Sequence, residues 1–155
     1  SVKIGNSAKI GDSTKIGNSA EIGYSAKIGD YHHITKSYNV FTPEYIYMML
    51  GVAPDSAGYY TLYKSVNFER TSFYAPTHTY HDGSSWEAAA GLQRNQEIEC
   101  GAGCHFTTVV RAIEFAQDRA HVIVSAKIHI SDILSVHQKI RVRKYTDVRE
   151  VNLCL

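Results

Sequence analysis

The first 30 residues repeat a six-residue unit, and this period limits what the start of the chain can fold into. The units read SVKIGN, SAKIGD, STKIGN, SAEIGY and SAKIGD, which places Ile4, Ile10, Ile16, Ile22 and Ile28 in register. Six is a multiple of the two-residue period of a strand but not of the 3.6-residue period of a helix, so a helix would scatter these isoleucines around its circumference. We therefore predict a non-helical segment, and a fixed period of this length favours a solenoid of stacked units.

The repeated units resemble the hexapeptide-repeat, left-handed β-helix family over residues 1–36. In that family three units make one triangular coil, with the aliphatic residue inward and a small residue at each corner. The resemblance implies a short left-handed β-helix whose corner residues are Ala8, Thr14, Ala20 and Ala26. Many members of the family are acyltransferases that use a histidine. Here His32 and His33 stand where the repeat frays, and we interpret them as surface residues.

A coil this short is predicted to need a partner. Fixing six residues costs about 6 to 12 kcal/mol in conformational entropy, whereas one buried isoleucine returns only about 1.5 to 3 kcal/mol. Hydrogen bonds between stacked coils must supply the rest, and they need a neighbour on each side. We therefore expect a homo-oligomer, and the family resemblance implies a trimer.

Tyrosine is dense in the segment 37–58 and at its borders. A tyrosine ring with its polar end suits a half-buried contact between the repeat and a following domain, or a contact with another chain. We therefore predict a capping segment that carries a protein-binding surface, with a short helix capped by Thr42 before Pro43. The candidate interaction residues are Tyr38, Tyr45, Tyr47, Tyr59 and Tyr60.

The remaining residues, 59–155, mix strand-like and helix-like patterns. YYTLYKSVNF, AHVIVSAKIHI and KIRVRKYTDVREV alternate in polarity and predict strands. VVRAIEFA predicts a helix capped by Thr107 or Thr108, whereas SSWEAAAGL is compatible with a capped helical turn or with an extended stretch. The sequence therefore predicts a small α+β domain after the β-helix.

Cys100, Cys104 and His105 resemble a set of metal ligands at first sight. Their spacing, C-x-x-x-C-H, is neither the paired C-x-x-C of a zinc site nor the haem attachment signal, and the sequence has no second pair. We therefore predict no metal. Three cysteines are an odd number, which disfavours a disulfide framework and fits a reducing compartment.

Two further resemblances concern residues 62–151. The order of LYK, ECGAGCHF, a helix and two strands resembles a small C-terminal domain of uncharacterised phage and prophage proteins. The turn before the helix is also similar to the ADP-ribosyltransferase pattern, which implies NAD as cofactor. That resemblance implies Tyr63 or Lys64 near the nicotinamide ribose, His105 near the ring, and Glu150 opposite the developing ribosyl cation. On the structural alternative, His105 is a hydrogen-bonded core histidine and Glu150 pairs with Arg141 or Arg143.

These patterns favour a non-enzymatic, phage-type accessory protein that binds a host or viral protein, with counter-defence as one role and no cofactor. The alternatives are an NAD-dependent transferase and a virion or tail-fibre component. A formal charge of +1 makes nucleic acid an unfavoured partner. No apolar stretch approaches the roughly 18 to 20 residues of a membrane span, and no leader pattern opens the sequence, so we expect a cytoplasmic protein.

Overall fold

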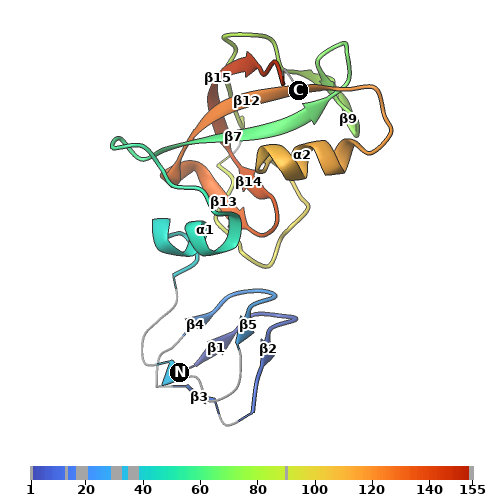
Figure 1. Ribbon diagram of the computed structural model, residues 1–155. Coiled ribbons are helices and arrows are strands. Elements are labelled where there is room, and N and C mark those ends of the chain that lie inside the picture. The colour runs from blue at the N-terminus through green and yellow to red at the C-terminus, as the bar shows by residue number, and fades with distance from the viewer. Residues whose placement is uncertain are drawn as a thin grey trace.

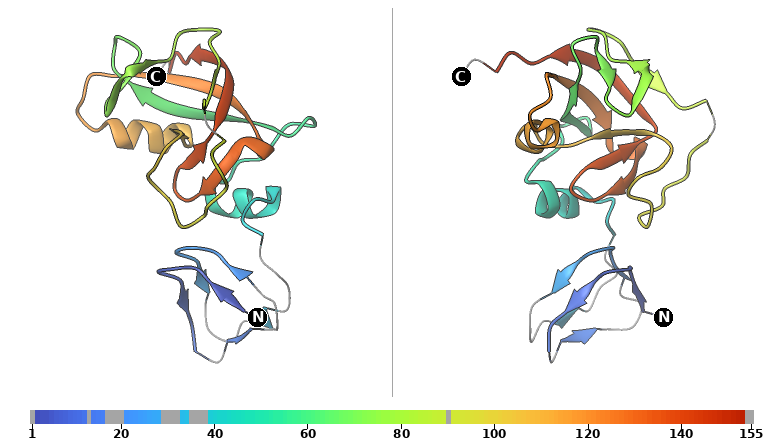
Figure 2. Two further views of the ribbon diagram at one scale, coloured as in Figure 1. Left: turned by 180° about the vertical axis from the view of Figure 1, so that it is seen from behind. Right: turned by 90° about the vertical axis from the view of Figure 1, so that its right-hand side faces the viewer.

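The computed structural model describes residues 2–12, 14–16, 21–28, 33–34, 39–89 and 91–153. It shows a small, mostly-β protein with antiparallel sheets and two helices. In Figures 1 and 2 the repeat segment lies at one end of the molecule, and the antiparallel sheets lie at the other end. Helix α1 (Pro43–Leu50) stands between these two parts.

A four-stranded antiparallel sheet, the main sheet, forms the centre of the C-terminal part. Its strand order is β10 (Trp86–Glu87), β15 (Lys144–Glu150), β12 (Val122–His129) and β7 (Tyr59–Val66). Strands β7 and β12 pair along all eight residues, which confirms both predicted strands. Three alternate residues of β7 are fully buried: Tyr60, Leu62 and Val66. Because side chains alternate between the faces of a strand, Lys64 shares this core face.

A smaller antiparallel sheet, the small sheet, packs against the core face. Its order is β11 (Cys104–Phe106), β14 (Ile140–Val142) and β13 (Ile133–Val136), and a 3-10 turn at Ile130–Asp132 connects β12 to β13. Tyr63 and Thr107 exchange two backbone hydrogen bonds of 2.8 Å, which join the edge of β7 to the end of β11. A hairpin of β8 (Thr71–Ser72) and β9 (Ala75–Thr79) stands beside β7.

Both predicted helices are present. Helix α1 begins after Thr42, whose hydroxyl accepts a hydrogen bond from the amide of Tyr45, and it ends at Gly51 in the left-handed conformation. Helix α2 (Val109–Ala116) is capped in the same way by Thr108, and it lies along β7 with Ala112 and Ala116 buried. The stretch SSWEAAAGL contains strand β10 and no helix among its described residues.

The prediction of a left-handed β-helix joined to an α+β domain is wrong. The repeat strands β1 (Lys3–Ile4), β2 (Lys9–Ile10), β3 (Lys15–Ile16), β4 (Glu21–Ile22), β5 (Lys27–Ile28) and β6 (His33–Ile34) form three separate two-stranded parallel sheets. Each strand has one partner, 18 residues away, so no sheet of the described segment continues as a solenoid or closes. The expected internal column is also incomplete, because Ile22 is buried but Ile4 is 50% exposed.

The repeat segment contacts the C-terminal part through residues of its fourth unit. A side chain at Gly23 would lie 2.8 Å from the Val40 side chain and 3.1 Å from the Tyr45 hydroxyl, so the close contact with α1 requires glycine there. The neighbouring Tyr24 ring lies edge-on to the ring of His137, with 4.9 Å between the ring centres. The repeat therefore rests on α1 and on the turn between β13 and β14.

Candidate functional site

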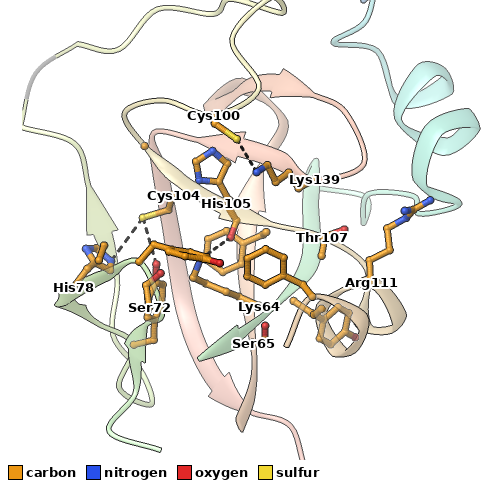
Figure 3. A pocket seen from close by; sticks show the side chains of 18 of the residues that line it. Lys64, Ser65, Ser72, His78, Cys100, Cys104, His105, Thr107, Arg111 and Lys139 are labelled. Atoms are coloured by element: carbon orange, nitrogen blue, oxygen red, sulfur yellow. Dashed lines mark hydrogen bonds between the residues drawn. The ribbon is translucent and has the colours of Figure 1, made fainter. Parts of the chain in front are cut away.

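A cavity of about 860 Å³ opens between β7, β11, helix α2 and the hairpin β8–β9 (Figure 3). Its size is within the usual range for sites that hold a small organic molecule. Most of the wall is apolar or aromatic, with Tyr63, Tyr74, Tyr80, Trp86, Phe106 and Phe115. The polar groups that line it include Lys64, His78, Cys104, His105 and Lys139. A few polar groups among aromatic walls are typical of a ligand site.

Lys64 places an amine in this cavity from the core face of the main sheet. Its Nζ donates a hydrogen bond of 3.3 Å to the backbone carbonyl of His105 and lies 5.5 Å from the centre of the Tyr80 ring. Within the ranges that the structure describes, no carboxylate forms an ion pair with Lys64. Burial, with a smaller contribution from the charge of Lys139, lowers the pKa of Lys64 to about 8.

A chain of neutral polar groups lies next to Lys64. The Cys104 sulfur is 3.7 Å from both the Tyr80 hydroxyl and Nε2 of His78, and that same nitrogen is 2.8 Å from the Tyr145 hydroxyl. Burial raises the pKa of the Cys104 thiol and of both tyrosine hydroxyls, and it lowers the pKa of His78. Desolvation therefore favours the neutral form of every member of the chain.

His105 lies on the same wall, but its ring is held by the backbone. Its Nε2 is 3.2 Å from the carbonyl oxygen of Glu99, and burial, with smaller contributions from the charges of Lys139 and Lys64, lowers its pKa to about 4. A neutral ring that donates to a carbonyl suits the structural interpretation of His105. Of the two residues His105 and Lys64, Lys64 is therefore the one that carries a charge near neutral pH.

The rim loop, residues 95–103, closes one side of the cavity, and it depends on Arg141. This arginine is 3% exposed, and its guanidinium donates to the carbonyl oxygens of Ile98 at 3.2 Å and Ala102 at 2.8 Å. Gly103 ends the loop with φ of +116°, and a side chain there would lie 2.6 Å from the carbonyl oxygen of Val142. The loop therefore covers Arg141 and keeps its guanidinium out of water.

Charged side chains of both signs also line the cavity. Lys139 donates a hydrogen bond of 2.9 Å to the exposed Cys100 sulfur. Glu99, Arg111 and Glu114 are further charged residues of the lining. A ligand therefore meets positive and negative groups in a lining that is otherwise mostly apolar and aromatic.

The structure brings together three of the four residues of the NAD-based hypothesis. Tyr63, Lys64 and His105 all line the cavity, but Glu150 does not. The Glu150 carboxylate pairs with Arg70, and its amide donates to Asp82, so the predicted pairing with Arg141 or Arg143 is wrong. The cavity therefore lacks the carboxylate that this hypothesis assigned to the ribosyl cation.

Sequence reasoning missed His78, Tyr80 and Trp86. They come from the hairpin and from β10, whose short strands give little periodic signal, and no motif marks them. The sequence draws attention to Cys100, Cys104 and His105 as candidate metal ligands, and to His105 also through the NAD-based hypothesis, but it does not link Cys104 to Lys64. No group of three or more metal-ligating side chains forms among the described residues.

The candidate interaction tyrosines divide into two kinds. Tyr45 and Tyr60 are buried in the core, whereas Tyr47 is 60% and Tyr59 38% exposed on the surface, and Tyr38 lies outside the described residues. Of the four described tyrosines of this set, Tyr47 and Tyr59 are therefore the two whose rings a partner could reach. Protein binding, the homo-oligomer, the domain boundaries and the cytoplasmic location stay predictions.

The buried histidines predict that acid destabilises the fold. His105 has a folded pKa of about 4 against about 6.5 unfolded. Between these values the unfolded chain binds a proton that the folded chain does not, so stability falls as the pH falls below 6.5. Urea unfolding at pH 7.5 and pH 5 should show a loss of about 1 to 2 kcal/mol due to His105.

The variant His105→Gln isolates this contribution, because glutamine can donate to the Glu99 carbonyl but does not titrate. Its unfolding free energy should fall less than that of the wild type between the two pH values. Equal losses in both proteins would contradict the assignment. His78 and His137, whose pKa values are also lowered chiefly by burial, act in the same direction in both proteins.

Comparisons with models of known families, with curated proteins and with solved structures find no match to the chain. They therefore give no support to the resemblance to hexapeptide-repeat proteins, to phage proteins or to ADP-ribosyltransferases, and the described sheets contradict the first of these directly. Neither helix in the described part of the chain is long and apolar enough to cross a bilayer.

Proposed function

We propose that the chain binds a planar, largely apolar small molecule in the cavity, with an acceptor oxygen of the ligand directed at Lys64. The observation that supports this most strongly is the amine itself. Lys64 stands on the core face of the main sheet, at a position whose alternate neighbours are fully buried. Lys64 is itself half-buried, and among the described residues no carboxylate pairs with it. A partly desolvated cation of this kind destabilises the fold, so its place is better explained by a ligand than by stability.

The walls define the shape of the ligand. The lining rings of Tyr80 and Trp86 both stack on Tyr145 behind the wall, with ring centres 5.6 Å and 6.0 Å apart. Rings of this kind offer flat apolar surfaces on which a conjugated or aromatic molecule can lie. The neutral Cys104 and His78 add hydrogen-bonding groups without adding charge. An aromatic carboxylate, sulfonate or carbonyl compound has the matching features.

The single tryptophan of the chain is in the cavity lining and reports on occupancy. The probe is 1-anilinonaphthalene-8-sulfonate, which is aromatic and carries a sulfonate. We expect it to bind one to one, to gain emission and to quench Trp86. Its binding should weaken about tenfold in Lys64→Met, because a hydrogen bond between charged groups is lost.

Two controls separate charge recognition from general apolar binding. Lys127→Met removes an exposed lysine of the neighbouring strand β12 and should leave the affinity unchanged. N-phenyl-1-naphthylamine, which lacks the sulfonate, should bind Lys64→Met as well as it binds the wild type. The proposal fails if the sulfonate probe does not quench Trp86, or if it binds Lys64→Met and the wild type equally.

A further inference from the structure

The contacts of the Lys64 amine leave it able to react with a ligand as well as to bind one. Among the described residues, its hydrogen-bond partner is the backbone carbonyl of His105 at 3.3 Å, and the face of the Tyr80 ring lies on its other side, 5.5 Å from the amine to the ring centre. Neither partner fixes the amine as an ammonium ion in the way that a carboxylate would. Figure 3 shows the Lys64 side chain running across the middle of the cavity below His105. The nitrogen is therefore held where a bound molecule would meet it.

Groups that can move a proton stand beside this amine. Cys104, His78 and the hydroxyls of Tyr80 and Tyr145 form one connected chain of contacts of 2.8 to 3.7 Å. The amine donates to the carbonyl of His105, the residue after Cys104, and lies over the ring of Tyr80, which places the chain of contacts near the amine. Addition of an amine to a carbonyl group needs such groups, because a proton must reach the carbonyl oxygen and water must leave.

We propose that Lys64 forms a reversible imine with aromatic aldehydes that enter the cavity. This inference rests on the proposed function, since it names a ligand class for the same site. The lone pair of Nζ attacks the carbonyl carbon, a C–N bond forms, and the carbonyl oxygen takes a proton. The resulting carbinolamine loses its hydroxyl group as water together with the N–H proton. The sum is amine plus aldehyde to imine plus water, with no oxidation or reduction.

The electrostatics of the site support the reactive form. Only the neutral amine is a nucleophile, and a lysine in an apolar pocket beside another cation is the usual way to obtain it near neutral pH. Burial and the neighbouring Lys139 lower the pKa of Lys64 to about 8. An ordinary lysine in water keeps far less neutral amine at pH 7.5, since its side chain titrates near pH 10.4.

The test traps the imine on the full chain. The protein is incubated at pH 7.5 with 4-formylbenzoate and sodium cyanoborohydride, which reduces the imine to a stable secondary amine, and labelled lysines are located by peptide mass spectrometry. We expect Lys64 to be modified at least about tenfold faster than Lys127. Lys64→Met should lose the fast phase, and 1-anilinonaphthalene-8-sulfonate should slow it. Equal rates at Lys64 and Lys127 would overturn the inference.

A second reagent distinguishes the possible failures. Trace labelling with acetic anhydride measures the reactivity of Lys64 without an aromatic ligand. Fast acetylation with slow aldehyde trapping overturns the imine, and slow reaction with both reagents overturns it as well, because the amine is then not reachable or not neutral. The proposed function is judged separately by the sulfonate probe, which cannot form an imine. Tight, Lys64-dependent binding of that probe without trapping leaves ligand binding in place and removes only the covalent step.

Discussion

Replacing Lys64 with methionine should raise the free energy of unfolding by about 1 to 3 kcal/mol at pH 7. The folded state lowers the pKa of this lysine from 10.5 to about 8, so folding works against its charge. For a base whose pKa is lowered by folding, the unfolded chain binds a proton between pH 8 and 10.5 that the folded chain does not. Stability therefore rises with pH across this window, and below pH 8 the full penalty is present.

Methionine has a similar length and no charge, so it removes the penalty and keeps most of the packing. The upper end of the expected gain, about 3 kcal/mol, applies to a fully desolvated amine. The lower end applies because the Lys64 side chain still meets the cavity, where water screens part of the charge. We expect a gain in stability together with the loss of ligand affinity described above.

Urea unfolding at two pH values checks the cause of this gain. The advantage of Lys64→Met should be present at pH 7 and should shrink as the pH approaches 10.5, where the lysine is neutral in both states. Lys127→Met, on the exposed side of β12, should change stability by less than about 0.5 kcal/mol at either pH. A Lys64→Met protein that is less stable than the wild type at pH 7 would contradict the argument.

A position at which the natural residue is the less stable choice is characteristic of a functional site. The two-residue alternation of YYTLYKSV already contains this signal, because Lys64 interrupts a set of apolar residues on one face. Sequence analysis gave Lys64 a role only through a resemblance. The alternation alone would have marked the same residue by a physical argument.

Local signals predicted the regular elements well. Thr42 before Pro43 and Thr108 before VVRAIEFA mark helix starts because their hydroxyls accept bonds from the first amides. The alternating stretches became β7 and β12, and the last one became both β14 and β15. These features depend on neighbours in the sequence, so the sequence is enough to predict them.

The prediction of a β-helix was wrong because the six-residue period determines the spacing of strands and corners but not how many coils stack on one another. Residues 18 apart do pair, as three six-residue units require, but each strand finds a single partner. A solenoid needs partners on both sides, and its core needs every isoleucine covered. Ile22 meets this condition because the contact with α1 lies beside it at Gly23, whereas Ile4 does not.

The cavity could not be predicted from the sequence, for a different reason. Its walls come from segments that are far apart in the chain: β7, the hairpin, the rim loop and α2. Lys64 and Cys104 are 40 positions apart in the sequence. Tyr63 pairs with Thr107 and so brings β11 beside β7, but no local sequence pattern predicts this pairing. For Glu150 the prediction failed in the opposite way. The similarity to the ADP-ribosyltransferase pattern placed Glu150 in the site, whereas the pairing of β15 in the main sheet places it beside Arg70.

Replacing Arg141 with methionine should lower the free energy of unfolding by about 3 kcal/mol. Besides the carbonyls of Ile98 and Ala102, the guanidinium reaches the Asn95 carbonyl at 3.5 Å and the Ser135 hydroxyl at 3.4 Å. Methionine fills the volume but leaves these acceptors without a donor, and each buried unsatisfied group costs about 1 to 3 kcal/mol. Some of the loop carbonyls can instead accept hydrogen bonds from water, so the expected loss of unfolding free energy is smaller than the sum of the costs of the four separate groups.

Hydrogen exchange and urea unfolding together check this prediction. In Arg141→Met the amides of the rim loop should exchange faster than in the wild type, while those of β7 and β12 change in proportion to global stability alone. Arg149→Met is the matched control, because Arg149 is exposed on β15 and pairs with Asp147, and it should cost less than about 0.5 kcal/mol. Should Arg141→Met fail to fold, Arg141→Lys, which retains one donor group, tests the same point.

If Arg141→Met lowered the free energy of unfolding by less than about 1 kcal/mol, the rim loop would keep its conformation without Arg141, and the cavity would not depend on the small sheet. The expected larger loss would instead tie ligand binding to β14. Residues 95–103 would then open without the arginine, water would enter beside Lys64, and the pKa of the amine would return toward its ordinary value because its desolvation is relieved. Arg141 would thus stabilise the fold directly and, by keeping water from the cavity, would keep the pKa of Lys64 low enough for the imine step.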